Sequence, residues 1–256
     1  MEFLESAIIL GGTSGLGREI AKRLLSMKIR PIIMGRSVLR CQNDSELDGC
    51  AFVHVDLTKV NQWAPNVLHG IMRHGPPVTQ VYWVAGVVQH KPFHQLLPDE
   101  MNELLTTHVS GPMVVLNHIY NELVEAGRPI KLITIASTST FRFRSAEELY
   151  CPAKAFKANW AVQMMGRLQE DLPGSTSTLI MPGGMKTPFW LGEEVDISAF
   201  MDPGIIAGIV LSHALVDPEE DQHRVHGFLP IVINRSWLGD PIITYELPAL
   251  EWPRPL

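Results

Sequence analysis

The stretch AIILGGTSGLGREI (residues 7–20) decides the fold. A short apolar run ends in a glycine cluster, and a helical pattern follows it, so we predict a buried strand, a tight turn and a helix. Glycine permits the turn and lets backbone N–H groups approach a pyrophosphate, whose charge is favoured at a helix N-terminus. The order strand, glycines, helix therefore predicts a dinucleotide-binding loop. The alternative is a glycine-rich turn that binds nothing.

Apolar runs alternate with helical patterns along the rest of the chain. The alternation predicts βαβ units with a parallel sheet buried on both faces. We expect one Rossmann-type, doubly wound, three-layer αβα domain over residues 1–256, closed by a tail that is extended and irregular from about 238 to 256. The strands are predicted at 7–10, 31–34, 51–55, 80–86, 130–137, 177–181 and 227–233, and the clearest helices at 18–27, about 98–126 and about 149–171.

Composition and charge exclude several classes of function. The net charge of −6 argues against a broad basic surface for nucleic acid. The apolar stretch 205–216 is shorter than the ~20 residues that a membrane-spanning helix needs, and the N-terminus lacks the basic start of a secretory signal. Cys41, Cys50 and Cys151 show no paired spacing, which favours a reducing compartment. We expect a cytoplasmic protein that binds neither nucleic acid nor membrane.

A metal site is not predicted either. His90 and His94 are four residues apart, but Pro92 interrupts a continuous helix between them. No carboxylate nearby completes a ligand set.

The second predicted strand ends in MGRS (residues 34–37). An NAD-binding domain of this type carries a carboxylate here for the ribose 2′-hydroxyl. This chain has Gly35, Arg36 and Ser37 instead. A guanidinium can pair with a 2′-phosphate through two parallel hydrogen bonds. The sequence therefore predicts NADP(H) in preference to NAD(H), and the alternative for Arg36 is a solvated surface arginine.

The stretch ELYCPAKAFK (residues 148–157) places Tyr150 and Lys154 one helical turn apart. A neighbouring ammonium stabilises a phenolate, so we expect the pKa of Tyr150 to fall from its usual value of about 10. Pro152 fits a first helical turn, which predicts that the helix begins close to Tyr150. The alternative is an amphipathic surface helix with no chemistry.

These motifs together resemble the short-chain dehydrogenase/reductase family over nearly the whole chain. The glycines match the family's TGxxxGxG signature, with Leu10 in place of threonine. Tyr150 and Lys154 match YxxxK, and Ser137 lies thirteen residues upstream, as the family's catalytic serine does. The resemblance implies that Tyr150 exchanges a proton with the substrate oxygen and that Lys154 holds the nicotinamide ribose. It also implies that Ser137 hydrogen-bonds the carbonyl oxygen.

The resemblance implies the cofactor contacts as well. Asp56 resembles an acceptor for the adenine amino group, although an acid at a strand end is often a helix cap. Thr187 resembles the residue that contacts the nicotinamide carboxamide, and otherwise caps a turn. The predicted cofactor-binding set is Gly11, Thr13, Ser14, Gly15, Leu16, Gly17, Arg36, Ser37, Asp56, Leu57, Ala85, Gly86, Tyr150, Lys154, Pro182, Gly183 and Thr187.

Two further positions depart from the family pattern. The family's NNAG reads WVAG here, so Val84 replaces the structural asparagine. In THVSG, His108 stands where the family has its fourth catalytic residue, an asparagine. A histidine there would bond a water of the proton relay and add its own pH dependence. The alternative is a packed histidine without catalytic duty.

The family places a substrate lid at about residues 184–202. We expect a small carbonyl or alcohol substrate of apolar or aromatic character, with pocket residues His90, Phe141, Phe143, Met185, Phe189 and Trp190. The expected protein is an NADP(H)-dependent carbonyl reductase or alcohol dehydrogenase that forms a homodimer or homotetramer through the helices at 98–126 and 149–171. The alternatives are a dehydratase or epimerase that uses the same nucleotide, and an NADP-responsive binding module with vestigial activity.

Overall fold

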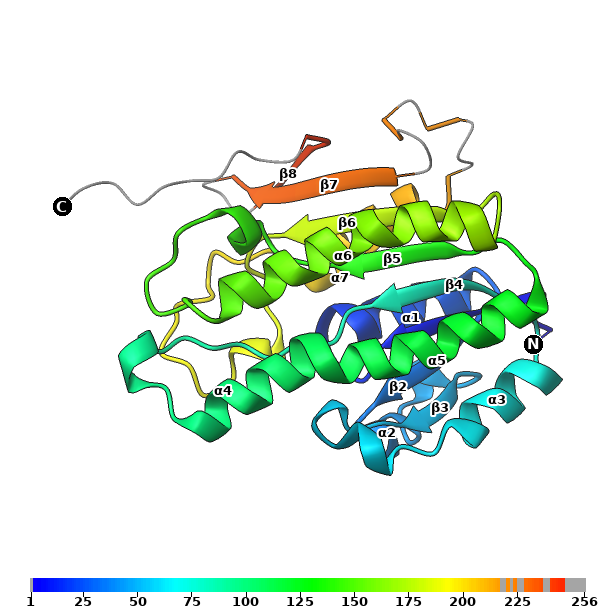
Figure 1. Ribbon diagram of the computed structural model, residues 1–256. Helices are drawn as coiled ribbons and strands as arrows, with labels where there is room; N and C mark the ends of the chain where they lie inside the picture. The colour runs from blue at the N-terminus through cyan, green and yellow to red at the C-terminus, as the bar shows by residue number, and fades with distance from the viewer. Residues whose placement is uncertain (1, 217–219, 222, 225–227, 237–239, 247–256) are drawn as a thin grey trace.

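The predicted strands form one twisted sheet. The computed structural model describes residues 2–216, 220–221, 223–224, 228–236 and 240–246. In this part of the chain the strand order is β3-β2-β1-β4-β5-β6-β7-β8, parallel throughout except for β8, which runs antiparallel to β7 (Figure 1). The strands are β1 (Glu5–Leu10), β2 (Ile29–Gly35), β3 (Ala51–His54), β4 (Val78–Trp83), β5 (Lys131–Ile135), β6 (Thr176–Pro182), β7 (Phe228–Arg235) and β8 (Pro241–Thr244).

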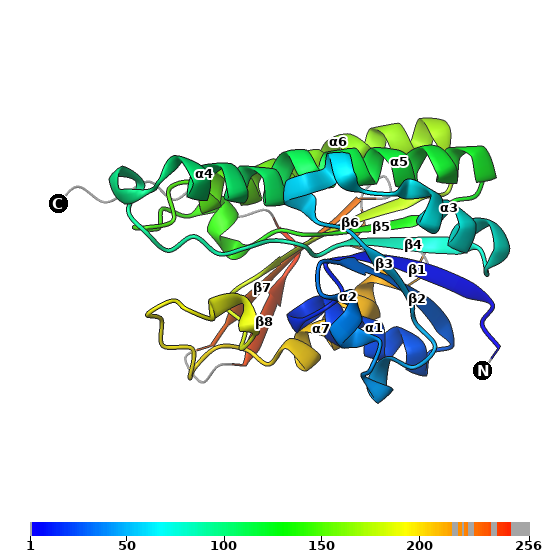
Figure 2. The ribbon, with the colours of Figure 1, turned by 90° about the horizontal axis from the view of Figure 1, so that it is seen from below.

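Helices cover both faces of the sheet, as Figure 2 shows. One face carries α1 (Gly15–Ser26) and α7 (Pro203–Ala214), and the other carries α3 (Pro65–His74), α5 (Gly111–Ala126) and α6 (Tyr150–Asp171). Two shorter helices are α2 (Val38–Cys41) and α4 (Pro98–Leu105). This arrangement confirms the predicted Rossmann-type αβα fold.

Burial on both faces explains why the strands read as continuous apolar runs. Successive side chains of a strand point to opposite faces. Ile9 accordingly packs into the core beneath α1 and α7, whereas Ile8 and Leu10 pack into the core on the side of α5 and α6. All three side chains are fully buried.

The predicted helix at about 98–126 is interrupted in the structure. It consists of α4, one π-helical turn at Thr106–Ser110, and α5. It ends at Gly127, whose left-handed φ of 64° suits glycine and closes the last turn. Short π-helical segments often occur at functional sites, and this one carries His108.

Among the labelled helices and strands of the described residues, four were not predicted from the sequence. These are α2, α3, α7 and β8. Asp202 caps α7 by accepting a hydrogen bond from the N–H of Ile205, and Pro203 occupies its first turn. The prediction of an irregular tail is wrong for Pro241–Thr244, because a proline can begin an edge strand without losing a sheet hydrogen bond. The tail residues 238–239 and 247–256 lie outside the described residues, as does residue 227 of the last predicted strand.

The strand order reverses between β1 and β4, which positions the site. Ligands of open α/β sheets bind in the crevice outside the carboxyl ends of the strands at such a switch point. The glycine loop follows β1, and the stretch Val84–Ala85–Gly86 follows β4. No helix in the part of the chain that the structure describes is long and apolar enough to cross a membrane.

Candidate functional site

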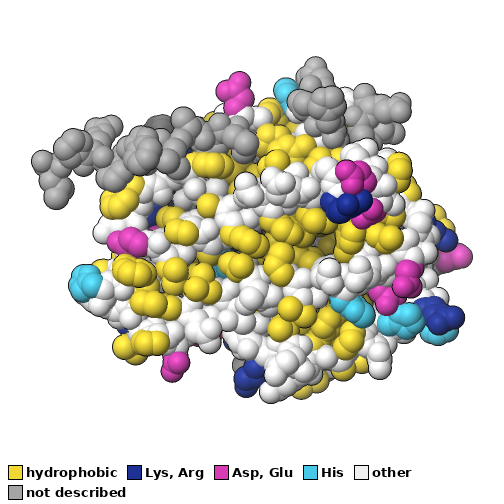
Figure 3. All heavy atoms as spheres, in the orientation of Figure 1, with side chains coloured by type: hydrophobic (Ala, Val, Ile, Leu, Met, Phe, Trp, Pro, Cys, Tyr) yellow, Lys and Arg dark blue, Asp and Glu magenta, His cyan; other side chains and the backbone are white. Residues whose placement is uncertain are grey.

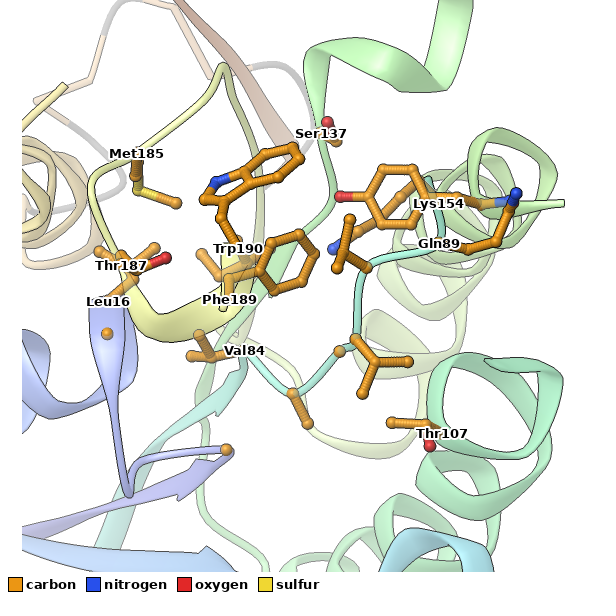
Figure 4. A pocket seen from close by; sticks show the side chains of 18 of the residues that line it. Leu16, Val84, Gln89, Thr107, Ser137, Lys154, Met185, Thr187, Phe189 and Trp190 are labelled. Carbon is orange, nitrogen blue, oxygen red and sulfur yellow. The ribbon is translucent and has the colours of Figure 1, made fainter. Parts of the chain in front are cut away.

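A cavity of about 1230 Å³ opens at the carboxyl ends of the parallel strands. Its walls run from the glycine loop and the ends of β2 and β3, past β4 and β5, to the start of α6 and the segment after β6. Figure 4 shows Phe189 and Trp190 between Thr187 on one side and Lys154 on the other. The cavity therefore joins the predicted cofactor and catalytic residues in one continuous space.

The glycine loop forms a tight cradle at the start of α1. Gly11 has a φ of 95°, and a Cβ there would collide with the backbone nitrogen of Ala85. Gly17 lies outside the cavity, where a Cβ would collide with the carbonyl oxygen of Gly11, so it acts through packing. Gly15 faces Thr187, with 3.2 Å from its Cβ position to the Thr187 Cβ. At Gly11 and Gly17 only a glycine allows the backbone approach. Gly15 and Leu16 at the N-terminus of α1 line the cavity.

The far end of the cavity gathers residues from the ends of β2 and β3. Arg36, Ser37, Asp56 and Leu57 all line it. The Arg36 side chain is 57% exposed, and its Nη1 lies 3.9 Å from a carboxylate oxygen of Glu103. Asp56 accepts hydrogen bonds from the N–H and the hydroxyl of Thr58 through one carboxylate oxygen. Asp56 thus caps the following turn and also faces the cavity, so the two predicted roles are compatible.

Ser137, Tyr150 and Lys154 come together on the opposite wall. Ser137 follows β5, while Tyr150 and Lys154 lie in the first two turns of α6, and all three line the cavity. The prediction that the helix begins close to Tyr150 is confirmed, since α6 starts at this residue. The side chains of Tyr150 and Lys154 are almost fully buried, and the Lys154 Nζ lies 5.5 Å from the centre of the Tyr150 ring.

Burial controls the proton affinity of this pair. Desolvation raises the pKa of Tyr150, the Glu147 carboxylate raises it further, and a hydrogen bond with Ser137 partly offsets both. Burial lowers the pKa of Lys154 to about 7. The expected lowering of the Tyr150 pKa is therefore wrong for the protein chain by itself, because removal from water disfavours phenolate and ammonium alike.

His108 lies behind the cavity wall rather than in it. Its ring is fully buried, and its Nε2 lies 2.9 Å from the Val87 nitrogen and 2.7 Å from the Val87 oxygen. A Cβ on Gly86 would come within 2.6 Å of the imidazole, so the ring packs tightly under the stretch after β4. Burial, followed by the charges of Lys154 and Lys157, holds the pKa of His108 well below its usual value. These contacts are those of a packed histidine, which is the alternative to a catalytic His108 that the sequence left open.

Lys157, which lies one turn beyond Lys154, was not predicted as a site residue. It is fully buried, and its Nζ donates to the carbonyl oxygens of Ala85 at 2.7 Å and Ile135 at 3.4 Å. The same Nζ lies 4.4 Å from the centre of the Trp83 ring. Lys157 therefore ties the carboxyl ends of β4 and β5 together beneath the site. The sequence feature that could have pointed to Lys157 is its spacing of three residues from Lys154, which places the two lysines on the same side of a helix.

Glu147 and Gln89 were also missed, although both line the cavity. Glu147 accepts a hydrogen bond from the Ser139 hydroxyl at 3.1 Å. The side-chain Oε1 of Gln89 accepts hydrogen bonds from the backbone N–H groups of Leu149 and Tyr150 at the start of α6. Neither residue belongs to a motif, so their roles depend on folding that brings distant loops together.

The predicted lid segment is pinned at its base. Met185 and Met201 form a bridge in which Lys186 donates its N–H to the oxygen of Met201 at 2.9 Å. Above it, the ring centre of Phe189 lies 6.1 Å from that of Tyr150 and 5.3 Å from that of Trp190. An aromatic wall therefore stands directly opposite the tyrosine.

The predicted substrate residues divide into two groups. His90, Met185, Phe189 and Trp190 line the cavity. Phe141 instead packs beside a separate apolar cluster, and Phe143 is 56% exposed. Neither phenylalanine lines the cavity, whereas Arg142 and Arg144 on either side of Phe143 do.

Among the described residues, no group of three or more histidine, cysteine or acidic side chains is arranged to hold a metal ion.

Comparison with known proteins agrees with this geometry. The family model described as "short chain dehydrogenase" matches residues 5–195, and the chain belongs to this family of oxidoreductases. An uncharacterised oxidoreductase of Myxococcus xanthus is 26% identical over 220 residues, covering 79% of this chain and 84% of the relative. A 2,5-dichloro-2,5-cyclohexadiene-1,4-diol dehydrogenase of Sphingobium indicum is 24% identical over 200 residues, covering 75% and 77%.

A solved structure shares the fold. The alcohol dehydrogenase of the archaeon Thermococcus sibiricus, solved in complex with 5-hydroxy-NADP, superposes with a TM-score of 0.73 at 19% identity. The match covers 88% of this chain and 95% of the archaeal chain.

Proposed function

We propose that the protein is an NADP(H)-dependent carbonyl reductase or alcohol dehydrogenase that acts on a small ketone or secondary alcohol. One observation carries the proposal. The triad Ser137, Tyr150 and Lys154 lines the same cavity as the glycine cradle at the start of α1. The cradle would hold the phosphates of a cofactor bound along this cavity, and the triad would face its reactive end.

The residues present fit a dinucleotide. Gly11 and Gly15 line the cavity at the N-terminus of α1, where backbone N–H groups favour a pyrophosphate. Arg36 lies beyond the end of β2 with its guanidinium largely exposed, where it can pair with a 2′-phosphate. Asp56, Leu57, Ala85 and Gly86 would hold the adenosine half, and Thr187 with Pro182 and Gly183 would hold the nicotinamide half.

NADPH, when bound, supplies the hydride. Tyr150 donates its phenolic proton to the carbonyl oxygen in reduction and accepts the alcohol proton in oxidation. Ser137 donates a hydrogen bond to the same oxygen and stabilises negative charge on it. Lys154 would hold the ribose hydroxyls and, when protonated, favours the phenolate that remains on Tyr150. The aromatic wall of Phe189 and Trp190 excludes water and favours an apolar substrate.

Preference for NADP(H) over NAD(H) is part of the proposal. It is supported by Arg36 and by the absence of an acidic residue at positions 35–37, where an NAD-binding strand end carries one. The archaeal structure with 5-hydroxy-NADP has the same fold.

Steady-state oxidation of NADPH with a panel of aliphatic and aromatic ketones tests the proposal. Turnover of any of them supports it. Tight NADPH binding without turnover of any ketone or alcohol would favour the binding module instead, and loss of water or inversion of a centre without net NADPH consumption would favour the dehydratase or epimerase.

We also propose that the protein forms a homodimer or homotetramer in the cytoplasm. Hydrophobic side chains gather over α5 and α6 on the face seen in Figure 3. An apolar groove of about 680 Å³ runs between these helices and includes Met113, Tyr120, Trp160 and Met164. Light scattering of wild type and Val114→Glu tests this: a monomeric wild type would contradict it, and a variant that dissociates would support it.

A further inference from the structure

The side-chain amide of Gln89 is buried and makes four hydrogen bonds. Gln89 lies in the loop after β4, is 7% exposed and lines the cavity (Figure 4). Its Oε1 accepts from the N–H of Tyr150 at 3.1 Å and from the N–H of Leu149 at 3.3 Å. Its Nε2 donates to the carbonyl oxygen of Ala146 at 2.7 Å and to that of Lys91.

The two accepted bonds replace a helix cap. The first N–H groups of a helix have no partner within the helix. Leu149, which precedes α6, has no side chain able to cap it. The Gln89 oxygen therefore satisfies N–H groups at the start of α6 from a position sixty residues earlier in the chain.

The two donated bonds hold the turn before the helix. Ala146 has a left-handed φ of 66°, which is unfavourable for a residue with a Cβ. Its carbonyl oxygen accepts from Gln89 and also from the N–H of Lys91 at 2.8 Å. The surrounding bonds thus hold a strained turn immediately before the tyrosine.

We propose that Gln89 is a positioning residue that sets the place of Tyr150 by capping α6 from the loop after β4. The inference rests on the proposed function. The same loop begins with Ala85 and Gly86, which line the cofactor side of the cavity. Gln89 therefore fixes the tyrosine relative to the bound nicotinamide rather than stabilising the helix alone.

An amide suits this position better than any other side chain of its length. A glutamate would accept from both N–H groups but could donate to neither carbonyl oxygen. A methionine has similar length and makes none of the four bonds. Gln89→Glu therefore keeps the two accepted bonds that cap α6 and loses the two donated bonds, whereas Gln89→Met loses all four.

Gln80 provides a matched control. It is a buried glutamine in β4, 2% exposed, and its Oε1 accepts a hydrogen bond from the Tyr82 hydroxyl at 2.6 Å. It does not line the cavity. Gln80→Met removes a buried amide from the same strand region without touching α6.

The experiment compares Gln89→Met, Gln89→Glu and Gln80→Met by kcat, KM, NADPH binding and hydrogen exchange of residues 146–154. Because a shift of about 1 Å in a reacting group can cost ~100-fold in rate, we expect Gln89→Met to lower kcat about 10- to 100-fold with little change in NADPH affinity. Exchange at Leu149 and Tyr150 should become faster. Gln89→Glu should keep their protection and show an intermediate kcat, and Gln80→Met should leave both unchanged.

Wild-type kcat in Gln89→Met, or an equal loss in Gln80→Met, would overturn the inference. If Gln89→Met does not fold, wild-type kcat in Gln89→Glu with faster exchange at Leu149 and Tyr150 would overturn it, and retained protection of these two amides would support it. If wild type turns over no substrate, the proposed function fails separately. Hydrogen exchange then decides the capping role: faster exchange in Gln89→Met supports it, and unchanged exchange refutes it.

Discussion

The imidazole of His108 meets the ring of Tyr150 edge-on, with ring centres 5.6 Å apart and planes at 88°. This contact places a buried ring directly behind the proposed acid. The Nδ1 of His108 has no hydrogen-bond partner among the described residues. Because burial and two neighbouring lysines lower its pKa, the imidazole is neutral at neutral pH. His108 therefore supports Tyr150 through packing and through Val87 rather than through its charge.

We expect His108→Asn to keep the shape of the pH profile. An asparagine amide can accept from the Val87 N–H and donate to the Val87 oxygen, so the backbone contact survives. We expect kcat within about threefold of wild type, since the replaced bonds are neutral and worth about 1 kcal/mol each. Measuring kcat/KM from pH 6 to 9 checks this. A limb near pH 6 to 7 that is present in wild type and absent from the variant would show that His108 does titrate in the reaction.

Lys154 should make the cofactor-free protein less stable as the pH falls. Its pKa drops from 10.5 in the unfolded chain to about 7 in the fold. Between these values the unfolded chain binds a proton that the folded chain does not. Burial of Lys154 therefore reduces the free energy of unfolding. This reduction is absent above about pH 10.5 and reaches its full size below pH 7.

Lys154→Met removes this reduction. We expect its free energy of unfolding to exceed that of wild type by an amount that grows between pH 9 and pH 7, reaching on the order of 3–5 kcal/mol. Denaturant unfolding of both proteins without cofactor, at several pH values, measures the difference. A difference that stays constant with pH would mean that Lys154 is not desolvated in the folded protein.

Arg36→Asp should weaken NADPH binding selectively. Replacing a charge-assisted pair with a repulsive carboxylate costs about 1.5–3 kcal/mol, so we expect KM for NADPH to rise about 10- to 100-fold. KM for NADH should change far less, because NADH has no 2′-phosphate. Steady-state kinetics with both cofactors gives the two ratios.

Glu103→Gln is the companion variant for Arg36. It removes the carboxylate that lies 3.9 Å from the guanidinium. Since an exposed ion pair is worth at most about 1 kcal/mol, KM for NADPH should stay the same or fall slightly. Equal losses of NADPH and NADH binding in Arg36→Asp would remove Arg36 from phosphate recognition.

The positions of the strands and the glycine cradle could be predicted because they depend on local pattern. Runs buried on both faces read as continuous apolar stretches, and the loop at Gly11 needs a residue without a Cβ. The helix start at Tyr150 followed from Pro152 in its first turn. Each of these features is decided by neighbours in the sequence.

The remaining features depend on contacts between distant segments. Gln89 meets α6 across some sixty residues, and Lys157 is paired only because β4 and β5 end side by side. The pKa of Tyr150 is raised because the side chain is buried, and the i+4 spacing from Lys154 does not reveal that burial. The π-helical turn around His108 likewise has no residue that marks it in the sequence.

The central claim is that Tyr150 is the proton donor and acceptor of an NADP(H)-dependent reaction. Tyr150→Phe keeps the buried ring and removes only the hydroxyl, so NADPH binding should stay close to wild type. We expect the rate of NADPH-dependent ketone reduction to fall at least 100-fold, in line with general acid catalysis worth about 10²–10⁴-fold. NADPH binding and ketone reduction measured on wild type and Tyr150→Phe decide the matter. Full reductase activity in the variant would contradict the account.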